Sequence, residues 1–553
     1  MEDYDVRSAS IVRRTSDLIA YLFIIAFLMF PFVYILHLPM YKQPVVIPPN
    51  PIQIENQLPG TTAWQLTDPA SYQSGRFADI EGYPWEESAE AGDTLAFSVS
   101  TTSPSFTADI YRLGWYGGTG GRLKKSISSI PGHFYPLPLM DTKTGLIDAH
   151  WPVSFTLTID PSWVTGMYIV KLTAANGKQD DIPFVIRSQR PAPLLFVHGD
   201  NTDQAYNPWG GKSLYEFNSS NGIRAYKVSF NRPLANQGDP GWGNLFRWEY
   251  PMIRYLEKRG YDIEYVSSVD TYTNADIFKN HAGVLIVGHQ EYWTKESRDH
   301  LETAINQGVN LAVFAGDTMG WQVRYEPSQN MQNRIIVCYK NAALDPLTGK
   351  DNSHVTVWPT ISPINQPVQS LLGSMSRGYF TGPGYPWIVA NASSWIYAGT
   401  NLHNGDSLPG LVGYEYDGVY QNYPVPEGLQ IVAKSPVEGI GRPHDEADAA
   451  LYVAQSGALV FNASTIQWSV GLDDYGSLTM GLKPAVNPTV QKITDNILRN
   501  MLSSANITSR QHYITQPTAT PTSTLPANNS PTPVHDQSNV PSSEFTYRDW
   551  VWT

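Results

Sequence analysis

Side chains suited to acid–base or metal chemistry follow a buried strand predicted at residues 284–287. The run GVLIVGHQEYW is apolar as far as Val287 and then ends in His289, Glu291 and Tyr292. A strand that is apolar on both faces is typical of the centre of a parallel sheet, and the carboxyl ends of such strands form the ligand crevice. An imidazole and a carboxylate at that edge can move protons or bind a cation. The alternative is that these groups cap the helix predicted in TKESRDHLETAINQG and hydrogen-bond within the loop.

Further polar residues stand at or near the ends of other predicted strands. They are His198 and Asp200 after LLFV, Tyr206 in DQAYNPWGGKS, Asp317 in AGDTMGW and Glu415 in LVGYEYDG. The chain has no GxSxG elbow and no HExxH motif, which disfavours covalent catalysis and excludes a helical zinc protease. The sole cysteine, Cys338, lies in an apolar run and is interpreted as a buried small hydrophobe. Any metal must therefore use oxygen or nitrogen ligands.

A glycine-rich run, TADIYRLGWYGGTGGRLKK, superficially matches a phosphate-binding loop. No helical pattern follows its glycines, so the sequence favours a turn between two strands. The aromatic residues of this run, Trp115 and Tyr116, are predicted to pack against a neighbouring domain. The glycines are Gly117, Gly118, Gly120 and Gly121.

The elements that must position these residues fall into two regions of different pattern. Residues 61–190 contain short alternating runs between turns, such as DTLAFSVSTT, VSFTLTI and GMYIVKLTA, which predict a jelly-roll or immunoglobulin-like β-sandwich. In residues 191–506 the runs LLFVH, IEYVS, GVLIVGH and NLAVFAG alternate with helical patterns such as WEYPMIRYLEKRG. That alternation predicts a doubly wound α/β domain with parallel strands, which LQIVAK, ALVFNAS and a closing helix in VQKITDNILRNML continue.

The N-terminal region carries a predicted transmembrane anchor at residues 18–38. Its uncharged run LIAYLFIIAFLMFPFVYIL is long enough to cross about 30 Å of hydrocarbon. Three arginines precede this run and only Lys42 closely follows it. The positive-inside rule therefore leaves residues 1–17 in the cytoplasm, and we expect a single-pass protein of the cell membrane whose bulk is extracellular.

The segments that flank the two folded regions have biased compositions. Residues 39–60 are rich in proline and are predicted to form a stiff, extended spacer. Residues 507–553 are rich in Ser, Thr and Pro and are predicted to be disordered. The chain has 37 basic and 50 acidic residues, a formal charge of −13 and no long basic stripe, so nucleic acid is not expected as a partner.

Eight motifs in order resemble the large (β) subunit of N,N-dimethylformamidase and its bacterial relatives. They are RLGWYGGTGGR, AYNPWGGKSLYEFNS, FRWEYPMIRYLEKRGYDIEYV, GHQEYW, WQVRYEPS, CYK, LVGYEYD and FNASTIQWSVGLD. The resemblance extends from roughly Gly82 to Leu502. It implies a jelly-roll-like β domain and an α/β domain related to class I glutamine amidotransferases. It also implies a mononuclear iron bound by two tyrosines and one glutamate, and it allows a small partner subunit, with a homo-oligomer as the alternative.

The resemblance assigns metal ligands residue by residue. Glu291 matches the metal glutamate and Tyr206 matches one metal tyrosine. For the second tyrosine, Tyr168 in GMYIVKL lies at a suitable interval before Tyr206, although it also fits an inward-facing core position of a sandwich strand.

The resemblance also implies catalytic residues around that metal. His289 matches the active-site histidine, and Lys340 and Glu415 resemble a lysine and a glutamate that support the site. Asp317 is a departure, because relatives usually have an asparagine there. Its extra negative charge is expected to retune or abolish the amide reaction.

The expected function is that of a membrane-anchored, extracytoplasmic amidohydrolase that converts a small amide into a carboxylate and an amine. A ferric ion held by two phenolates and a carboxylate is a hard Lewis acid, and His289 or Glu415 can move the protons. In the alternative interpretation the tyrosines are core residues and no metal binds. The protein is then a surface-displayed binding protein whose aromatic loops hold a glycan or cell-wall polymer.

Overall fold

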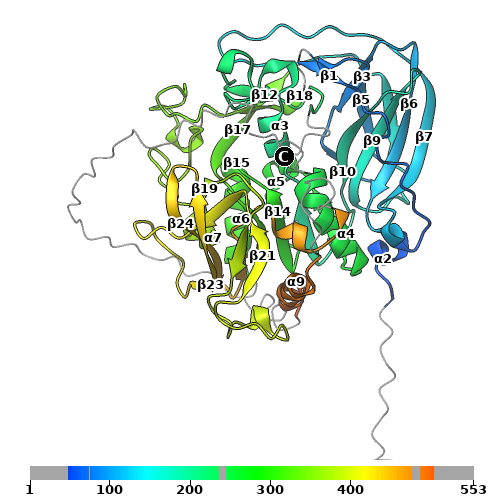
Figure 1. Ribbon diagram of the computed structural model, residues 1–553. Coiled ribbons are helices and arrows are strands. Elements are labelled where there is room, and N and C mark those ends of the chain that lie inside the picture. The colour runs from blue at the N-terminus through cyan, green and yellow to red at the C-terminus, as the bar shows by residue number, and fades with distance from the viewer. Residues whose placement is uncertain (1–47, 74, 236–244, 330, 476–485, 504–553) are drawn as a thin grey trace, which may run out of the picture. The chain divides into compact units, whose positions relative to one another are not determined.

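The computed structural model describes residues 48–73, 75–235, 245–329, 331–475 and 486–503 (Figure 1). They form a mixed α/β structure with many strands and few helices. The chain divides into two compact units, Met1–Pro49 and Asn50–Thr553, so the β-rich and α/β regions belong to one unit. The predicted anchor and the predicted disordered tail lie outside the described residues. No helix among the described residues is long and apolar enough to span a bilayer.

The first part of the larger unit contains two packed β-sheets. One sheet has the order β4-β10-β9-β6-β7 and the other has the order β3-β5-β8, which confirms the β-rich region predicted from the alternating runs. In β9 the side chains of Tyr168 and Val170 face the core between the two sheets, whereas Met167 and Ile169 face the α/β region. The strands are β1 (Tyr72–Gln73), β2 (Arg76–Phe77), β3 (Ile80–Pro84), β4 (Ser88–Ala89), β5 (Thr94–Thr101), β6 (Ser105–Leu113), β7 (Gly121–Pro131), β8 (Phe155–Thr158), β9 (Gly166–Ala174) and β10 (Gln179–Ile186).

A seven-stranded sheet with the order β13-β11-β14-β16-β25-β24-β23 forms the centre of the α/β region. Its first five strands are parallel, as the apolar runs predicted, and β24 and β23 extend it as antiparallel strands. These strands are β11 (Leu194–Val197), β13 (Ile263–Val266), β14 (Gly283–His289), β16 (Asn310–Gly316), β23 (Gln430–Gly439), β24 (Arg442–Val453) and β25 (Leu459–Asn462).

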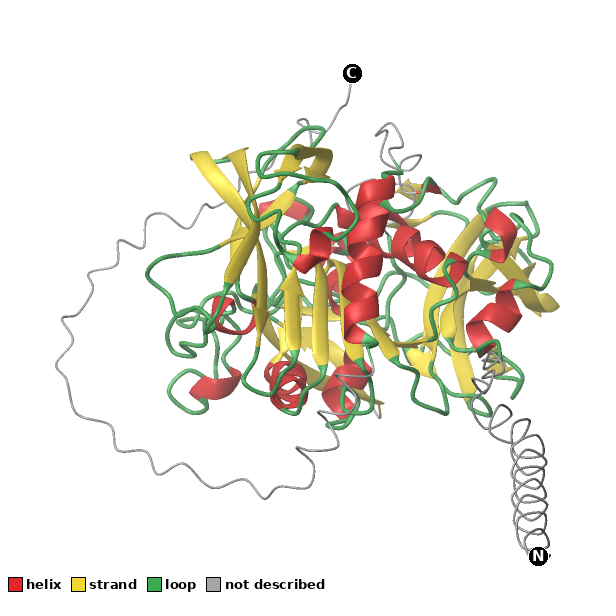
Figure 2. Cartoon of the chain, turned by 90° about the horizontal axis from the view of Figure 1, so that it is seen from below, coloured by secondary structure: helices red, strands yellow, loops and turns green. Residues whose placement is uncertain are grey.

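Helices cover both faces of the parallel strands (Figure 2). On β14, Leu285 and Val287 pack in one apolar cluster with α4 and α9, while Val284 and Ile286 pack in another with α6 and α7. Burial on both faces explains why this strand is apolar at every position from 284 to 287. The helices are α3 (Asp200–Tyr206), α4 (Tyr250–Lys258), α5 (Ser268–Thr273), α6 (Lys295–Asn306), α7 (Gln369–Leu372) and α9 (Pro488–Met501).

Smaller sheets lie around the carboxyl ends of the parallel strands. One has the order β12-β18-β17-β15, and two antiparallel pairs are formed by β19 with β22 and by β20 with β21. The helix predicted after Trp293 is α6, which begins at Lys295 with Thr294 as its N-cap. These strands are β12 (Lys227–Ser229), β15 (Tyr292–Thr294), β17 (Trp321–Ser328), β18 (Met331–Val337), β19 (Met375–Tyr379), β20 (Tyr385–Ile388), β21 (Ser407–Val412) and β22 (Glu415–Gly418).

A short helix, α2 (Pro51–Asn56), occupies part of the range predicted as an extended spacer. Asn50 caps it, because its side chain accepts from the Gln53 amide while the Gln53 side chain accepts from the Asn50 amide. Pro51 stands at the first helical position, where its fixed φ favours a helix and its missing N–H costs nothing. The predicted extended spacer is therefore wrong for residues 51–56.

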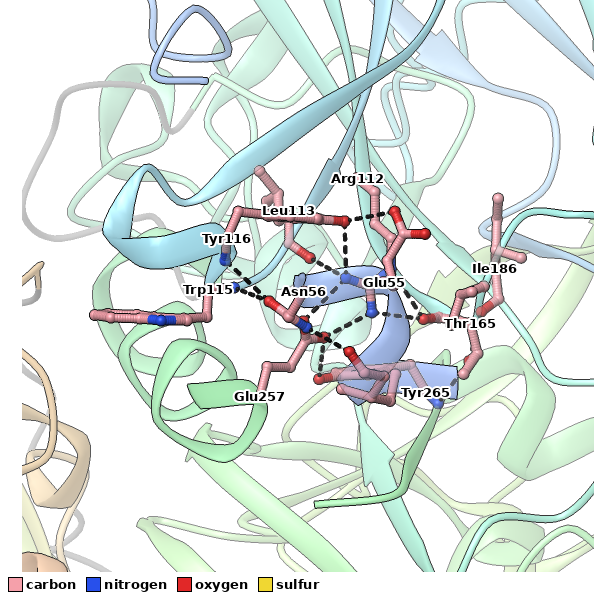
Figure 3. Close-up of polar contacts among 12 residues, drawn as sticks. Glu55, Asn56, Arg112, Leu113, Trp115, Tyr116, Thr165, Ile186, Glu257 and Tyr265 are labelled. Atoms are coloured by element: carbon pink, nitrogen blue, oxygen red, sulfur yellow. Dashed lines mark hydrogen bonds and ion pairs between the residues drawn. The ribbon is translucent and has the colours of Figure 1, made fainter. Parts of the chain in front are cut away.

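A buried ion pair joins the β-sandwich to the α/β region (Figure 3). The guanidinium of Arg112, on β6, donates to both carboxylate oxygens of Glu257, on α4, at 2.7 and 2.9 Å. Glu55 and Tyr116 extend the network, since the Tyr116 hydroxyl donates to Glu55 at 2.9 Å. Tyr116 begins the turn η1 (Tyr116–Gly118) between β6 and β7, which confirms that the glycine-rich run is a turn.

Candidate active site

Four of the predicted site residues lie at or just after the carboxyl ends of β14 and β16 or on β22: His289, Glu291, Asp317 and Glu415. His289 is the last residue of β14 and pairs with Gly316 at the end of β16, so Asp317 follows at the same edge. Glu415 begins β22, and the Asp317 amide donates to Asp417 of that strand at 2.8 Å. The ends of β14 and β16 thus place His289 and Asp317 at one edge of the seven-stranded sheet, as the strand-end rule predicted, and β22 of a separate two-stranded sheet brings Glu415 to them.

The imidazole of His289 lies between two carboxylates. Its Nε2 atom is 2.7 Å from Oε2 of Glu415 and 3.5 Å from Oε2 of Glu291. One ligand atom each from His289, Asp317 and Glu415 lies within 4.8 Å of the other two. The backbone of Glu291 is fixed by Thr202, whose hydroxyl accepts from the Glu291 amide at 3.1 Å.

Two tyrosines complete this cluster of acids. The Tyr215 hydroxyl donates to Oε1 of Glu291 at 2.6 Å. The rings of Tyr215 and Tyr206 are stacked with centroids 4.4 Å apart, and the Tyr206 ring lies 5.1 Å from the ring of His289. Two phenols and a carboxylate therefore lie next to one another, from Tyr206, Tyr215 and Glu291.

Tyr215 was missed by sequence reasoning, although it stands in the same motif as Tyr206. The chain reverses between them through η2 (Trp209–Gly211), where Gly210 and Gly211 have φ of +77° and +82°. The Leu214 amide then donates to the Ala205 carbonyl at 2.9 Å, which sets the two tyrosine rings side by side. The glycine pair was the available signal, because glycine adopts positive φ at no steric cost.

Tyr168, predicted as the second metal tyrosine, does not lie with this cluster. It is fully buried in the core of the sandwich, its hydroxyl donates to the Val164 carbonyl at 2.7 Å, and its ring stacks on Trp163. Alternation along β9 points its side chain away from the α/β region. The structure therefore separates Tyr168 from Tyr206 and Glu291, and the tyrosine that lies beside those two residues is Tyr215.

Lys340 lies against the aromatic side of the cluster. Its ammonium nitrogen is 3.4 Å from the centroid of the Tyr215 ring and 4.8 Å from that of Trp321. Burial lowers the pKa of Lys340 to about 8, against the attraction of Glu291. The ammonium form at neutral pH offsets part of the negative charge of the carboxylates.

Burial and neighbouring charges shift the pKa values of Asp317, Glu415 and His289. Burial, together with the carboxylates of Glu291 and Glu415, raises the pKa of Asp317 well above its usual range. Burial also raises the pKa of Glu415, although His289 opposes the shift, and it raises the pKa of Asp417 to about 7. For His289, burial lowers the pKa, but Glu415 and Glu291 outweigh it and the net shift is upward. Crowded, desolvated carboxylates of this kind favour a bound cation.

The side chains present fit a hard metal ion. Oε2 of Glu291 is buried and accepts no hydrogen bond in the described part of the chain, while Oε1 already faces a phenol. Two phenol oxygens and a carboxylate form an all-oxygen donor set, which suits a hard cation such as ferric iron. Tyr206 and Tyr215 are only partly buried, so a small molecule can approach them.

A second buried cluster contacts the residue between His289 and Glu291. His198, at the end of β11, has its Nδ1 atom 2.7 Å from Oε2 of Glu249. Oε1 of Glu249 accepts from the Gly199 amide and from the side chain of Gln290, which stands between His289 and Glu291. Sequence reasoning singled out His198 but missed Glu249, which lies at the end of the π-helical turn η4 (Leu245–Glu249).

The comparisons with known proteins give one family. No curated protein matches the chain. Among solved structures, an uncharacterized protein from Bacillus anthracis str. Ames is 17% identical and covers 20% of this chain and 85% of that chain; its TM-score of 0.13 supports no inference about the fold. The family model described as N,N-dimethylformamidase beta subunit-like, C-terminal matches residues 107–481, which is more than half of the chain. The chain therefore belongs to the N,N-dimethylformamidase beta subunit-like family.

Proposed function

We propose that the protein is a metal-dependent hydrolase of the N,N-dimethylformamidase type, which cleaves the C–N bond of a small amide to give a carboxylate and an amine. The proposal rests mainly on the contact of Tyr215 with Glu291, at 2.6 Å, beside the stacked ring of Tyr206. Membership of the family supports the reaction class. The relation of the α/β region to class I glutamine amidotransferases stays a prediction.

Tyr206, Tyr215 and Glu291 are the residues that would hold the metal. A ferric ion bound there supplies Lewis acidity that polarises an amide carbonyl and makes its carbon easier to attack. The two phenols must lose their protons on binding, so metal uptake releases protons to solvent. Lys340 compensates charge at this position, because its ammonium lies over the Tyr215 ring.

His289 and Glu415 are the residues that would move protons. Nε2 of the imidazole lies 2.7 Å from Oε2 of Glu415, and the end of β14 holds the ring at the edge of the site. It can take a proton from an attacking water and pass it to the departing amine nitrogen, which must leave as a neutral amine. Glu415 keeps the imidazole oriented during both transfers.

The test is metal content and colour of the purified protein after reconstitution with ferric iron. We expect one iron per chain and a visible phenolate-to-iron band, and Glu291→Gln should remove both without unfolding the protein. Release of amine from N,N-dimethylformamide should be lost in the same variant. A protein that folds cooperatively but stays colourless and metal-free would overturn the proposal and favour the binding-protein alternative.

The setting of the enzyme is part of the proposal. Residues 18–38 anchor the chain in the cell membrane with the catalytic region outside, because the arginines precede the apolar run. A small partner subunit or a homo-oligomer completes the assembly. Protease added to intact spheroplasts should digest the ectodomain, and full protection would reverse the orientation.

A further inference from the structure

We propose that Arg232 is a positioning residue for the metal site, because it holds the chain reversal that sets Tyr206 beside Tyr215. The inference deepens the proposed function and rests on it, since the spacing of the two phenols matters for chemistry only if they bind a metal. Arg232 follows β12 and is only 1% exposed.

The guanidinium of Arg232 lies inside the reversal. Its two Nη atoms donate to four backbone carbonyls at 2.7–3.1 Å, those of Gln204, Asn207, Trp209 and Lys212. Its Nε atom donates to the side-chain oxygen of Gln204 at 3.2 Å. A guanidinium presents five N–H groups in a rigid plane, so these acceptors keep their donors in only one arrangement of the segment.

The charge of Arg232 is held by amide oxygens rather than by an acid. Within the described part of the chain it forms no ion pair, and its five hydrogen bonds all end on uncharged oxygens. Carbonyl dipoles that converge on one point repel one another unless a cation lies between them. Without the guanidinium, several buried carbonyls would lose their donor, and the segment would rearrange to recover hydrogen bonds.

The reversal is also tied to the β-sandwich, through Trp209. The indole is fully buried in the apolar cluster of the sandwich, and its Nε1 atom donates to Glu81 at 2.8 Å. The Gly210 amide donates to the Gly75 carbonyl at 2.6 Å. The sandwich therefore holds the reversal at one place and Arg232 holds it at another, which fixes the path of the chain between them.

This path determines the spacing of the two phenols. Tyr206 is the last residue of α3, and Tyr215 follows the reversal, whose ends are joined by the bond from the Leu214 amide to the Ala205 carbonyl. The rings stack with centroids 4.4 Å apart only while the residues between them keep their path. Residues that orient metal ligands without touching the metal typically change metal affinity by about 10–100-fold. We expect an effect of that size from Arg232.

The test is Arg232→Lys in the full-length protein, because lysine keeps the charge but has three donors and no planar fork. Titration with ferric iron, followed in the visible band, should show about 10–100-fold weaker binding and a shifted phenolate-to-iron band. Hydrogen exchange of the metal-free protein should become faster in residues 204–215, because their hydrogen bonds open more readily.

Arg112→Lys is the matched control. Arg112 is also fully buried, but its guanidinium donates to Glu257 and to the Thr165 carbonyl, which lie outside the reversal. This variant should lose stability in urea unfolding while it keeps the iron affinity, the visible band and slow exchange in residues 204–215. Equally weakened iron binding in both variants would mean that a general loss of stability is responsible, and it would overturn the inference.

The outcomes separate this inference from the proposed function. Wild-type iron affinity and an unchanged band in Arg232→Lys would overturn only the positioning role. A wild-type protein that binds no iron would contradict the proposed function, and equal exchange of residues 204–215 in the wild type and the variant would then contradict the hold of Arg232 on the reversal as well.

A second variant serves if Arg232→Lys does not fold. Gln204→Met removes the acceptor of the Arg232 Nε atom and leaves the four carbonyl acceptors in place. It should change iron affinity and exchange in the same direction, by less than Arg232→Lys. Unchanged iron affinity together with unchanged exchange in Gln204→Met would overturn the inference.

Discussion

At the scale of single residues, two tyrosines with opposite roles allow a matched test of the metal site. Tyr215→Phe removes the oxygen that faces Glu291, so we expect loss of bound iron and of the visible band. Tyr168→Phe removes a hydroxyl that bonds only to the Val164 carbonyl among the described contacts. It should keep the metal and cost about 1 kcal/mol of stability. Mass spectrometry measures the iron content of both variants, and urea unfolding measures the stability of Tyr168→Phe. Unchanged iron content in Tyr215→Phe would contradict the assignment of Tyr215 as a metal ligand.

The same two tyrosines show how far the site could be predicted from sequence. His289, Glu291 and Asp317 were expected to lie together because they follow predicted parallel strands, and β14 and β16 do end at one edge of the sheet. Tyr215 depends instead on a chain reversal at two glycines, which a search by sequence interval does not reveal. The interval that selected Tyr168 carried no information on which face of β9 the side chain occupies, and alternation places it in the sandwich core.

At the scale of elements, the ion pair of His198 with Glu249 links the end of β11 to the turn before α4. Burial lowers the pKa of His198, but Glu249 outweighs it and raises the pKa to about 10. A folded pKa above the unfolded value of 6.5 means that the stabilisation is complete below about pH 6.5 and is lost as pH rises through about 10. The loss amounts to a few kcal/mol across that window.

We therefore expect Glu249→Gln to destabilise the protein at pH 6 and to flatten the fall of stability between pH 6.5 and 10. Urea unfolding at several pH values measures the slope. The matched control is His150→Asn, since the His150 side chain is 38% exposed beside Asp148 and contributes little. An unchanged slope in Glu249→Gln would show that His198 does not titrate as an ion pair.

Elements differ in how well the sequence predicted them. The parallel strands and α6 followed from long runs with clear periodicity, because burial on two faces or on one helical stripe leaves a strong pattern. Helix α2 was missed because prolines around it suggested an extended chain, while its capping box depends on only two side chains. The small sheets around the site were missed as well, since their strands are short and pair with residues far along the chain.

At the scale of the whole molecule, the pair of Arg112 with Glu257 couples the sandwich to the α/β region. Both side chains are fully buried. The guanidinium donates to the Thr165 carbonyl as well as to Glu257, so its hydrogen-bond acceptors come from both regions. Burial lowers the pKa of Arg112, but Glu257 outweighs it and the net shift is upward, so the guanidinium stays charged in the interior. Removing one partner leaves the other charge buried without compensation, which costs about 3–5 kcal/mol.

We expect Glu257→Gln to lower the free energy of unfolding by about that amount while both regions still unfold in one transition. The single transition is expected because residues 50–553 form one compact unit whose apolar cluster includes Met167 of the sandwich and Leu256 of α4. Arg190→Gln is the matched control: its pair with Asp262 is half exposed and should be worth less than about 1 kcal/mol. Chemical denaturation followed by fluorescence and circular dichroism makes the comparison. Two separate transitions in the wild-type protein, or equal costs for the two variants, would show that the sandwich and the α/β region are stabilised independently of this ion pair.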